Sequence, residues 1–263
     1  MVVSKRSSPL AAWSTSSVPI ASLVTKQKQS KCASTALTTK PNNLSLNSMT
    51  KLTPTSNSLW NQYKKVLWET FPDLEHTDTW ADWEENNTSL SAKLYNSKYI
   101  IKSREVEIWD EKSCIYNNII YPKTGENLPC FGMDLMGFFD KKVIIVFDFQ
   151  HPVENYLFSH PDLPKADGTF RFFEPGNHFS ENVFVRKCTM DQVNDYLDDF
   201  AAYLQVYKEM LESKKPSGFA VFSTYGDFDK YMKRLDPVSG YLSSKFGKEK
   251  AETLVNDFLF CYG

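Results

Sequence analysis

The middle of the sequence is a series of short strand-like segments. Apolar and polar residues alternate there with a period of two, the spacing at which successive side chains point to opposite faces of a β-strand. Polar breaks such as Asp110-Glu111-Lys112 separate the segments and are too short to hold a crossover helix. They therefore favour an antiparallel meander over parallel strands. The predicted strands are residues 90–95, 98–109, 113–121, 128–138 and 142–150.

Helical patterns flank these strands. An apolar stripe with helical spacing runs from Leu59 to Phe71, with Ser58 as the expected N-cap and Pro72 as the stop. One amphipathic helix ahead of the strands, with further helices after them, indicates the α/β class. The expected fold is a three-layer α/β/α sandwich around a central, mainly antiparallel sheet.

Three helical patterns follow the strands. Thr189 and Gln192 form a capping-box signature at the start of the longest one, whose apolar face runs to Leu211. Two shorter helices are predicted at residues 227–235 and 248–258. These helices are expected to cover the sheet.

Residues 1–57 differ in composition from the rest of the chain. They are rich in Ser and Thr, lack any apolar run long enough to span a membrane, and precede Glu69, the first acidic residue. Such a composition is typical of a plastid transit peptide, with a disordered tail as the alternative. We expect a leader over 1–57 and a single domain over 58–263, without membrane association. The location would be the plastid stroma if the leader is a transit peptide, and the cytoplasm otherwise.

Charge and cysteine content argue against several classes of function. From Glu69 onward the chain carries 21 basic and 32 acidic residues, a net charge of −11, which argues against nucleic-acid binding. The five cysteines and four histidines are scattered without metal-ligand spacing, and no Gly-rich phosphate loop occurs. No bound metal, flavin or nucleotide is therefore expected.

The strand from Leu128 to Met136 carries a carboxylate, Asp134, among apolar residues. Alternation places Asp134 on the same face as Cys130 and Gly132, whose side chains are small. A bare carboxylate is costly in such a strand, so it must be hydrogen-bonded, protonated or facing a ligand cavity. A satisfied buried Asp and a proton donor in a pocket both fit this pattern.

Several motifs in and around this strand resemble those of the ferredoxin-dependent bilin reductases. The resemblance spans residues 58–263 and is strongest to the branch that makes phycoerythrobilin. The matching residues are Ile119-Ile120-Tyr121-Pro122, Leu128-Pro129-Cys130-Phe131-Gly132-Met133-Asp134-Leu135, Val146-Phe147-Asp148-Phe149-Gln150-His151-Pro152, Gly176-Asn177-His178-Phe179-Ser180, Asp236-Pro237 and Phe258-Leu259-Phe260.

The resemblance implies a ferredoxin-dependent oxidoreductase that acts on CH-CH groups of biliverdin IXα. Reduced ferredoxin would deliver electrons singly from outside, and the protein would supply a proton for each. The implied product is phycoerythrobilin, formed through 15,16-dihydrobiliverdin by a monomeric enzyme. The alternatives are a single two-electron reduction, as in a phytochromobilin synthase or a dihydrobiliverdin-handling reductase, and a non-enzymatic bilin carrier.

Two acids match the proton donors of that family. By its place in the Phe-Gly-x-Asp-Leu motif, Asp134 is implied as the central donor, and Asp236 matches the second acid. Burial in a pocket would raise the pKa of both carboxyls enough for them to act near neutral pH. Without the resemblance, Asp236 would be read as the residue that ends a helix before Pro237. The presence of both acids favours an enzyme over a carrier.

Three further residues are candidates for contact with the substrate. Asn117 stands where the phycocyanobilin-forming branch has a histidine, and an amide cannot titrate, so it would hydrogen-bond, position water or simply face solvent. Arg171, in a strand predicted to begin at Phe170, would bind a ligand carboxylate or lie solvated on the surface. Met133 is a candidate from the central motif. Ser239 stands where related sequences carry Arg, which puts a propionate contact there in doubt.

The electron donor must approach a domain that is itself net negative. Ferredoxins of this system are acidic, so attraction requires a local basic cluster. The candidates are Lys123, Lys141, Lys142, Lys230, Lys233 and Arg234.

Overall fold

The computed structural model describes residues 58–123, 128–139, 142–156, 158–168, 170, 173–214, 225–235 and 238–261. The predicted leader lies outside the described residues, as do Lys141, Arg171 and Asp236.

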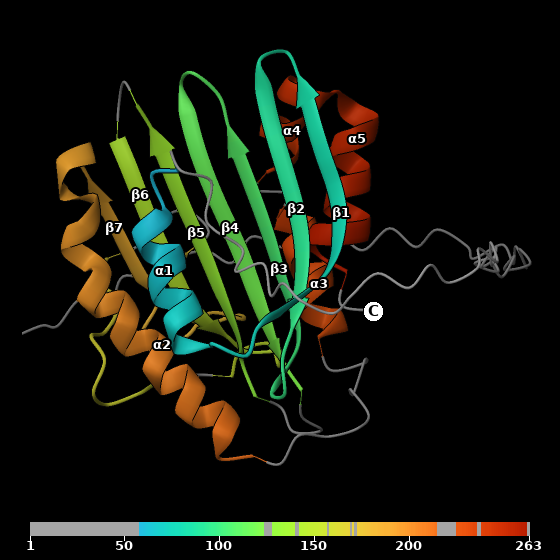
Figure 1. The fold of residues 1–263 in the computed structure, drawn as a ribbon. Helices are drawn as coiled ribbons and strands as arrows, with labels where there is room; N and C mark the ends of the chain where they lie inside the picture. The colour runs from blue at the N-terminus through green and yellow to red at the C-terminus, as the bar shows by residue number, and fades with distance from the viewer. Residues whose placement is uncertain are drawn as a thin grey trace, which may run out of the picture. The chain divides into compact units, whose positions relative to one another are not determined.

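Seven strands form one antiparallel sheet in which the spatial order equals the order along the chain (Figure 1). The five predicted strands correspond to β2 through β6, and the antiparallel meander is confirmed. The strands are β1 (Glu75–Glu85), β2 (Thr88–Asn96), β3 (Ile100–Trp109), β4 (Ser113–Pro122), β5 (Cys130–Phe138), β6 (Lys142–Gln150) and β7 (Phe184–Cys188).

The edge strand β1 was not predicted. Its sequence, EHTDTWADWEE, contains five acidic residues, and Ala81 is its one buried side chain. Register shifts between His76 and Asp78 and between Thr79 and Ala81 break the period of two. Charged, irregular strands are common at sheet edges, where they discourage pairing with another chain. The alternation on which the prediction depended is therefore absent here.

Helices cover both faces of the sheet, which confirms the three-layer α/β/α sandwich (Figure 1). On one face lie α1 (Asn61–Thr70) and α2 (Leu197–Glu212). On the other lie α3 (Gly226–Leu235), α4 (Ser239–Phe246) and α5 (Lys248–Thr253), which continues as a π-helical segment over Leu254–Leu259. Among the described residues, no helix is both long enough and apolar enough to cross a bilayer.

The alternation along the strands divides the apolar side chains between two cores. Phe131 of β5 packs beneath α1 and α2 in a core that includes Phe200. Val146 of β6 packs on the other face in a core that includes Phe228 of α3 and Leu254. We call these the α1/α2 face and the α3–α5 face.

The helix starts differ in detail from the sequence prediction. Trp60, not Ser58, occupies the N-cap position of α1, and the Ser58 hydroxyl accepts a hydrogen bond from the Trp60 N–H at 3.2 Å. The capping box of Thr189 and Gln192 is confirmed, but it opens a 3₁₀ segment, Met190–Tyr196, before α2 begins. Helix α4 was not predicted because its first turn contains serine and glycine, which are weak helix formers.

Candidate active site

Asp134 of β5 and Asn117 of β4 are register partners on the α3–α5 face of the sheet. The Asn117 Nδ2 donates a hydrogen bond to the Asp134 Oδ1 at 2.6 Å. Both side chains are half-buried. The structure therefore brings two of the predicted site residues into direct contact.

Burial raises the pKa of Asp134 to about 6, and the Asn117 hydrogen bond opposes this rise because it favours the carboxylate. A carboxyl group with such a pKa exchanges its proton close to neutral pH. That is the property required of a general acid.

Half-buried apolar side chains lie next to Asp134 on the same face. Ile115, Met136 and Ile144 are paired across β4, β5 and β6 and form a row beside the acid. Val238 and Tyr241 pack against the same core from the helical layer. Because these three side chains are only half-buried, part of the apolar surface beside the carboxyl remains accessible.

The structure does not bring Met133 to this site. Its side chain is buried in the core of the α1/α2 face. Met133 and Asp134 are successive residues of one strand, so their side chains point to opposite faces. A ligand on the Asp134 face would not contact Met133.

Buried acids also occur on the α1/α2 face, but described side chains satisfy them there. Glu105 accepts a hydrogen bond from the Tyr116 hydroxyl at 2.9 Å, and Lys64 of α1 pairs with Glu107. Burial raises the pKa of Glu105. Both acids are covered by protein, whereas Asp134 is partly accessible, so the accessible acid is on the α3–α5 face.

Asp148 of β6 is a second carboxyl on the Asp134 face, and the sequence analysis gave it no role. It is fully buried and accepts hydrogen bonds from the Ser180 N–H, at 3.0 Å, and from the Ser180 hydroxyl. Burial raises its pKa to about 7, against the effect of the Ser180 hydrogen bonds. The signal in the sequence was the same as for Asp134, a carboxylate in an apolar strand.

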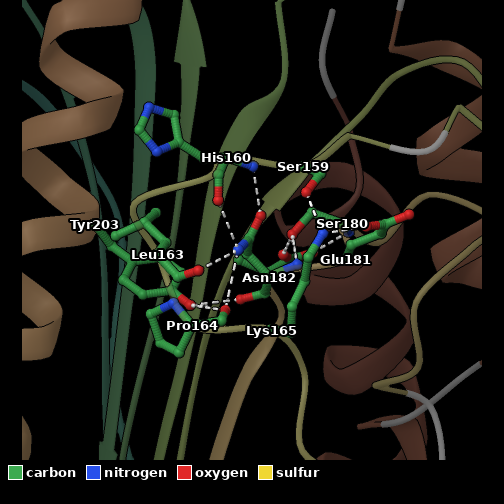
Figure 2. A network of polar contacts seen from close by, with 10 residues as sticks. Ser159, His160, Leu163, Pro164, Lys165, Ser180, Glu181, Asn182 and Tyr203 are labelled. Atoms are coloured by element: carbon green, nitrogen blue, oxygen red, sulfur yellow. Dashed lines mark hydrogen bonds and ion pairs between the residues drawn. The ribbon is translucent and has the colours of Figure 1, made fainter.

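Asn182 holds the chain around Ser180 in place (Figure 2). Its Nδ2 donates to the carbonyls of Leu163 and Pro164, each at 3.0 Å, and its Oδ1 accepts from the His160 N–H at 2.7 Å. The Asn182 N–H donates to the Ser180 hydroxyl oxygen at 3.0 Å. The segment between β6 and β7 is thus fixed beside Asp148.

A buried arginine connects the sheet to the helices that lie over the Asp134 face. Arg104 of β3 donates to the Phe258 carbonyl at 2.6 Å and to the Tyr121 hydroxyl. The Tyr121 hydroxyl in turn donates to Asp229 of α3 at 3.3 Å. These contacts fix α3 and the C-terminal helical segment on this side of the site.

The basic residues proposed for ferredoxin docking do not form one cluster. Lys230, Lys233 and Arg234 lie together on α3, beside a cavity of about 350 Å³ that reaches the chain after β6. Lys142 lies at the start of β6, and Gln150 ends that strand. A nine-residue strand separates the two ends by roughly 26 Å, so Lys142 does not belong to the α3 group.

Among the described residues, no group of three or more His, Cys, Asp or Glu side chains is placed to hold a metal ion. Arg171 and Asp236 lie outside the described residues, and their predicted roles stay predictions.

Comparison with known sequences gives one consistent result. The model of a protein family described as ferredoxin-dependent bilin reductase matches residues 71–261. Two similar proteins carry the name 15,16-dihydrobiliverdin:ferredoxin oxidoreductase. The one from Gloeobacter violaceus is 28% identical over 194 residues, covering 66% of this chain and 79% of that protein. The one from Nostoc punctiforme is 28% identical over 200 residues, covering 68% and 82%.

Among solved structures, the chain resembles phytochromobilin synthase from tomato, crystallised in complex with biliverdin. The TM-score is 0.59 at 16% sequence identity, and the match covers 76% of this chain and 83% of that one. At this identity the likeness shows a shared fold.

Proposed function

The chain belongs to the ferredoxin-dependent bilin reductase family, and from this premise we propose that it reduces biliverdin to 15,16-dihydrobiliverdin. Two reduced ferredoxins each give one electron, and two protons enter with them, so one carbon–carbon double bond becomes a single bond. Support comes from the relatives, whose name pairs 15,16-dihydrobiliverdin with ferredoxin.

The observation that carries this proposal is the half-buried Asp134 carboxyl held by Asn117 at 2.6 Å. Single electrons added to a tetrapyrrole must each be matched by a proton, and Asp134 has a pKa of about 6 and an accessible side chain. In the proposed reaction Asp134 delivers a proton to the reduced bilin. The apolar row of Ile115, Met136 and Ile144 supports the flat ring system.

Asn117 orients the acid in this proposal. Its amide cannot take up or release a proton at ordinary pH, so it does not relay protons. Its hydrogen bond stabilises the carboxylate that remains after transfer. Asn117 therefore sets both the direction and the acidity of the donor.

Continued reduction to phycoerythrobilin is the second candidate, favoured by a second acid in the sequence. Asp236 matches the family position of a further proton donor, and a four-electron reduction requires additional protons. In this case 15,16-dihydrobiliverdin is an intermediate that stays bound. A single two-electron reduction of another double bond, as in a phytochromobilin synthase, is distinguished from both candidates by its product.

An anaerobic assay with biliverdin, ferredoxin and a ferredoxin-reducing system tests the proposal. Absorption spectra during turnover and chromatography of the extracted pigment identify the product. Accumulation of 15,16-dihydrobiliverdin supports the two-electron reaction, and phycoerythrobilin supports the four-electron one. Tight biliverdin binding without any reduction would instead identify a bilin carrier, and no saturable binding would contradict all of these functions.

We also propose that residues 1–57 direct the protein to plastids, on the grounds of their Ser- and Thr-rich composition and lack of acidic residues. A fusion of these residues to a fluorescent protein should enter plastids in algal or plant cells. Retention of the fusion in the cytoplasm would contradict this targeting role.

A further inference from the structure

Gln150 ends β6 on the same face of the sheet as Asp134. Its register partner is Cys130, and alternation from Val146 through Asp148 points its side chain toward the α3–α5 face. The residue is only 6% exposed. Among the residues that the structure describes, none donates a hydrogen bond to its Oε1, which is buried.

The Gln150 amide rests on the backbone of Gly132. A Cβ added at Gly132 would lie 2.5 Å from the Gln150 Oε1 and 2.6 Å from its Nε2. The side chain therefore extends from the end of β6 along the sheet in the direction of Asp134. Gly132 and Asp134 are two residues apart on one face, about 6.8 Å along the strand.

A buried acceptor without a donor destabilises a folded protein, and native structures retain few of them. The neighbours of Gln150 on this face have structural roles. Cys130 and Gly132 pack closely against it, and the Cys130 thiol donates to the Gln150 carbonyl. The Asp148 carboxyl already accepts a hydrogen bond from Ser180. The amide oxygen is the polar atom of this group that lacks a partner. A ligand bound on this face, where the candidate acid Asp134 also lies, could supply the missing hydrogen-bond donor.

We propose that Gln150 is a substrate-positioning residue, whose Oε1 accepts a hydrogen bond from a pyrrole or lactam N–H of the bilin held against Asp134. The inference rests on the proposed function, since bilins are the substrates that offer such N–H groups. The terminal torsion of a glutamine side chain has a broad energy profile, so Oε1 can turn from Gly132 toward the ligand. Asp134 then supplies the proton while Gln150 fixes the ring position.

The variant Gln150→Met tests this role because methionine has nearly the same length and no acceptor of comparable strength. We expect the dissociation constant for biliverdin to rise about five- to tenfold, as for the loss of one hydrogen bond. The ligand-free variant should melt about 2–4 °C higher than the wild type, because the buried unpaired oxygen is gone. These opposite effects on binding and stability distinguish a positioning residue from a packing one.

The matched control is Gln205→Met, at an exposed position on α2. It should change neither biliverdin affinity nor melting temperature. A lower melting temperature with unchanged affinity for Gln150→Met would show that Gln150 only fills space over Gly132, and unchanged values of both would equally overturn the proposal.

A second variant covers the case in which Gln150→Met does not fold. Gln150→Glu keeps an acceptor at the same distance from the backbone, so it should retain most of the affinity. A loss of about tenfold or more would contradict the acceptor role. Biliverdin titration of the wild type comes first: if it binds no bilin, the proposed function fails, whereas binding by the wild type with any of the contrary results above overturns only the role of Gln150.

Discussion

In the proposed reaction, Asp134 supplies one transferable proton. Asp134→Asn keeps the side chain's size and still lets Asn117 donate its hydrogen bond, but it removes the acid. We expect biliverdin to bind as in the wild type, and turnover to fall about a hundred- to ten-thousand-fold. Single-turnover spectra measure the loss, and electron paramagnetic resonance should detect a trapped one-electron-reduced bilin. Product formation at the wild-type rate would exclude Asp134 as the proton donor.

In the proposed reaction, Asn117 sets the pH at which that acid works. A general acid acts in its protonated form, so kcat/KM should fall as pH rises above about 6, the pKa of Asp134. In Asn117→Leu the carboxylate loses its hydrogen bond, the pKa rises, and the fall should move upward by about 1 pH unit. A pH profile of kcat/KM in both proteins measures the shift. If kcat/KM of Asn117→Leu falls at the same pH as in the wild type, or at a lower pH, Asn117 does not act on this carboxyl.

Single residues were predictable from sequence where their chemistry contrasts with the strand around them. Asp134 carries such contrast, whereas Asn117 was identified by the family resemblance, and its pairing with Asp134 was seen only in the structure. Asp148 carries it too, but its partner Ser180 lies 32 residues further along the chain, in a segment without periodicity. Among the described residues, the Gln150 Oε1 lacks a hydrogen-bond donor because of how the chain packs around Gly132. No sequence pattern indicates such an arrangement.

At the scale of elements, Asp148 connects β6 to the segment before β7 and makes the fold sensitive to pH. Its pKa is about 7 in the folded protein, above the ordinary value of 3.8. Between these values the unfolded chain is ionised while the folded protein keeps its proton. The free energy of unfolding therefore falls as pH rises through this window, by up to about 1.4 kcal/mol per pH unit.

Asp148→Asn cannot ionise and still accepts a hydrogen bond from Ser180. Relative to the wild type, its free energy of unfolding should improve by about 1–4 kcal/mol between pH 4 and pH 7. Urea unfolding at both pH values gives this difference. Asp162→Asn, an exposed position in the same inter-strand segment, serves as the control. Parallel pH dependence in Asp148→Asn and wild type would mean that Asp148 is not a protonated buried group.

The elements themselves were predictable where apolar residues recur in the sequence with the period of a strand or of a helix. Strands β2 through β6 and helices α1, α2 and α3 have such periodic sequences. Strand β1 lies at the edge with almost no buried side chain, and α4 is a short helix of weak formers stabilised by packing, for example of Leu242 and Phe246. Such elements are stabilised by tertiary contacts, so the local sequence does not predict them.

At the scale of the whole molecule, docking of ferredoxin must overcome the domain's net negative charge. One local basic group lies on α3 and consists of Lys230, Lys233 and Arg234. Charge reversal of Lys230 and Arg234 to Glu should raise the KM for ferredoxin and weaken its dependence on salt, while bilin affinity stays unchanged. Steady-state kinetics at low and high ionic strength measure both effects.

Lys142→Glu provides the matched control for this prediction, because Lys142 is exposed at the far end of β6. It should leave the KM for ferredoxin close to that of the wild type. If Lys142→Glu impairs ferredoxin use and the α3 variant does not, the donor docks at the other end of the sheet. Wild-type activity that does not change with salt would argue against electrostatic docking altogether.

The sequential strand order also bears on how the chain is synthesised. Every strand pairs with its neighbour along the chain, so β1 to β6 can pair soon after they leave the ribosome, whereas β7 pairs only after the long segment that follows Gln150. Helices α3, α4 and α5, which cover the face that carries Asp134, are translated after all seven strands of the sheet. A nascent chain that ends after α2 thus holds a complete sheet with one apolar face, including Val106, Ile119 and Val146, open to water. During this interval the apolar face is exposed, so trigger factor or Hsp70-type chaperones should bind the chain at this length and release it once α3, α4 and α5 emerge.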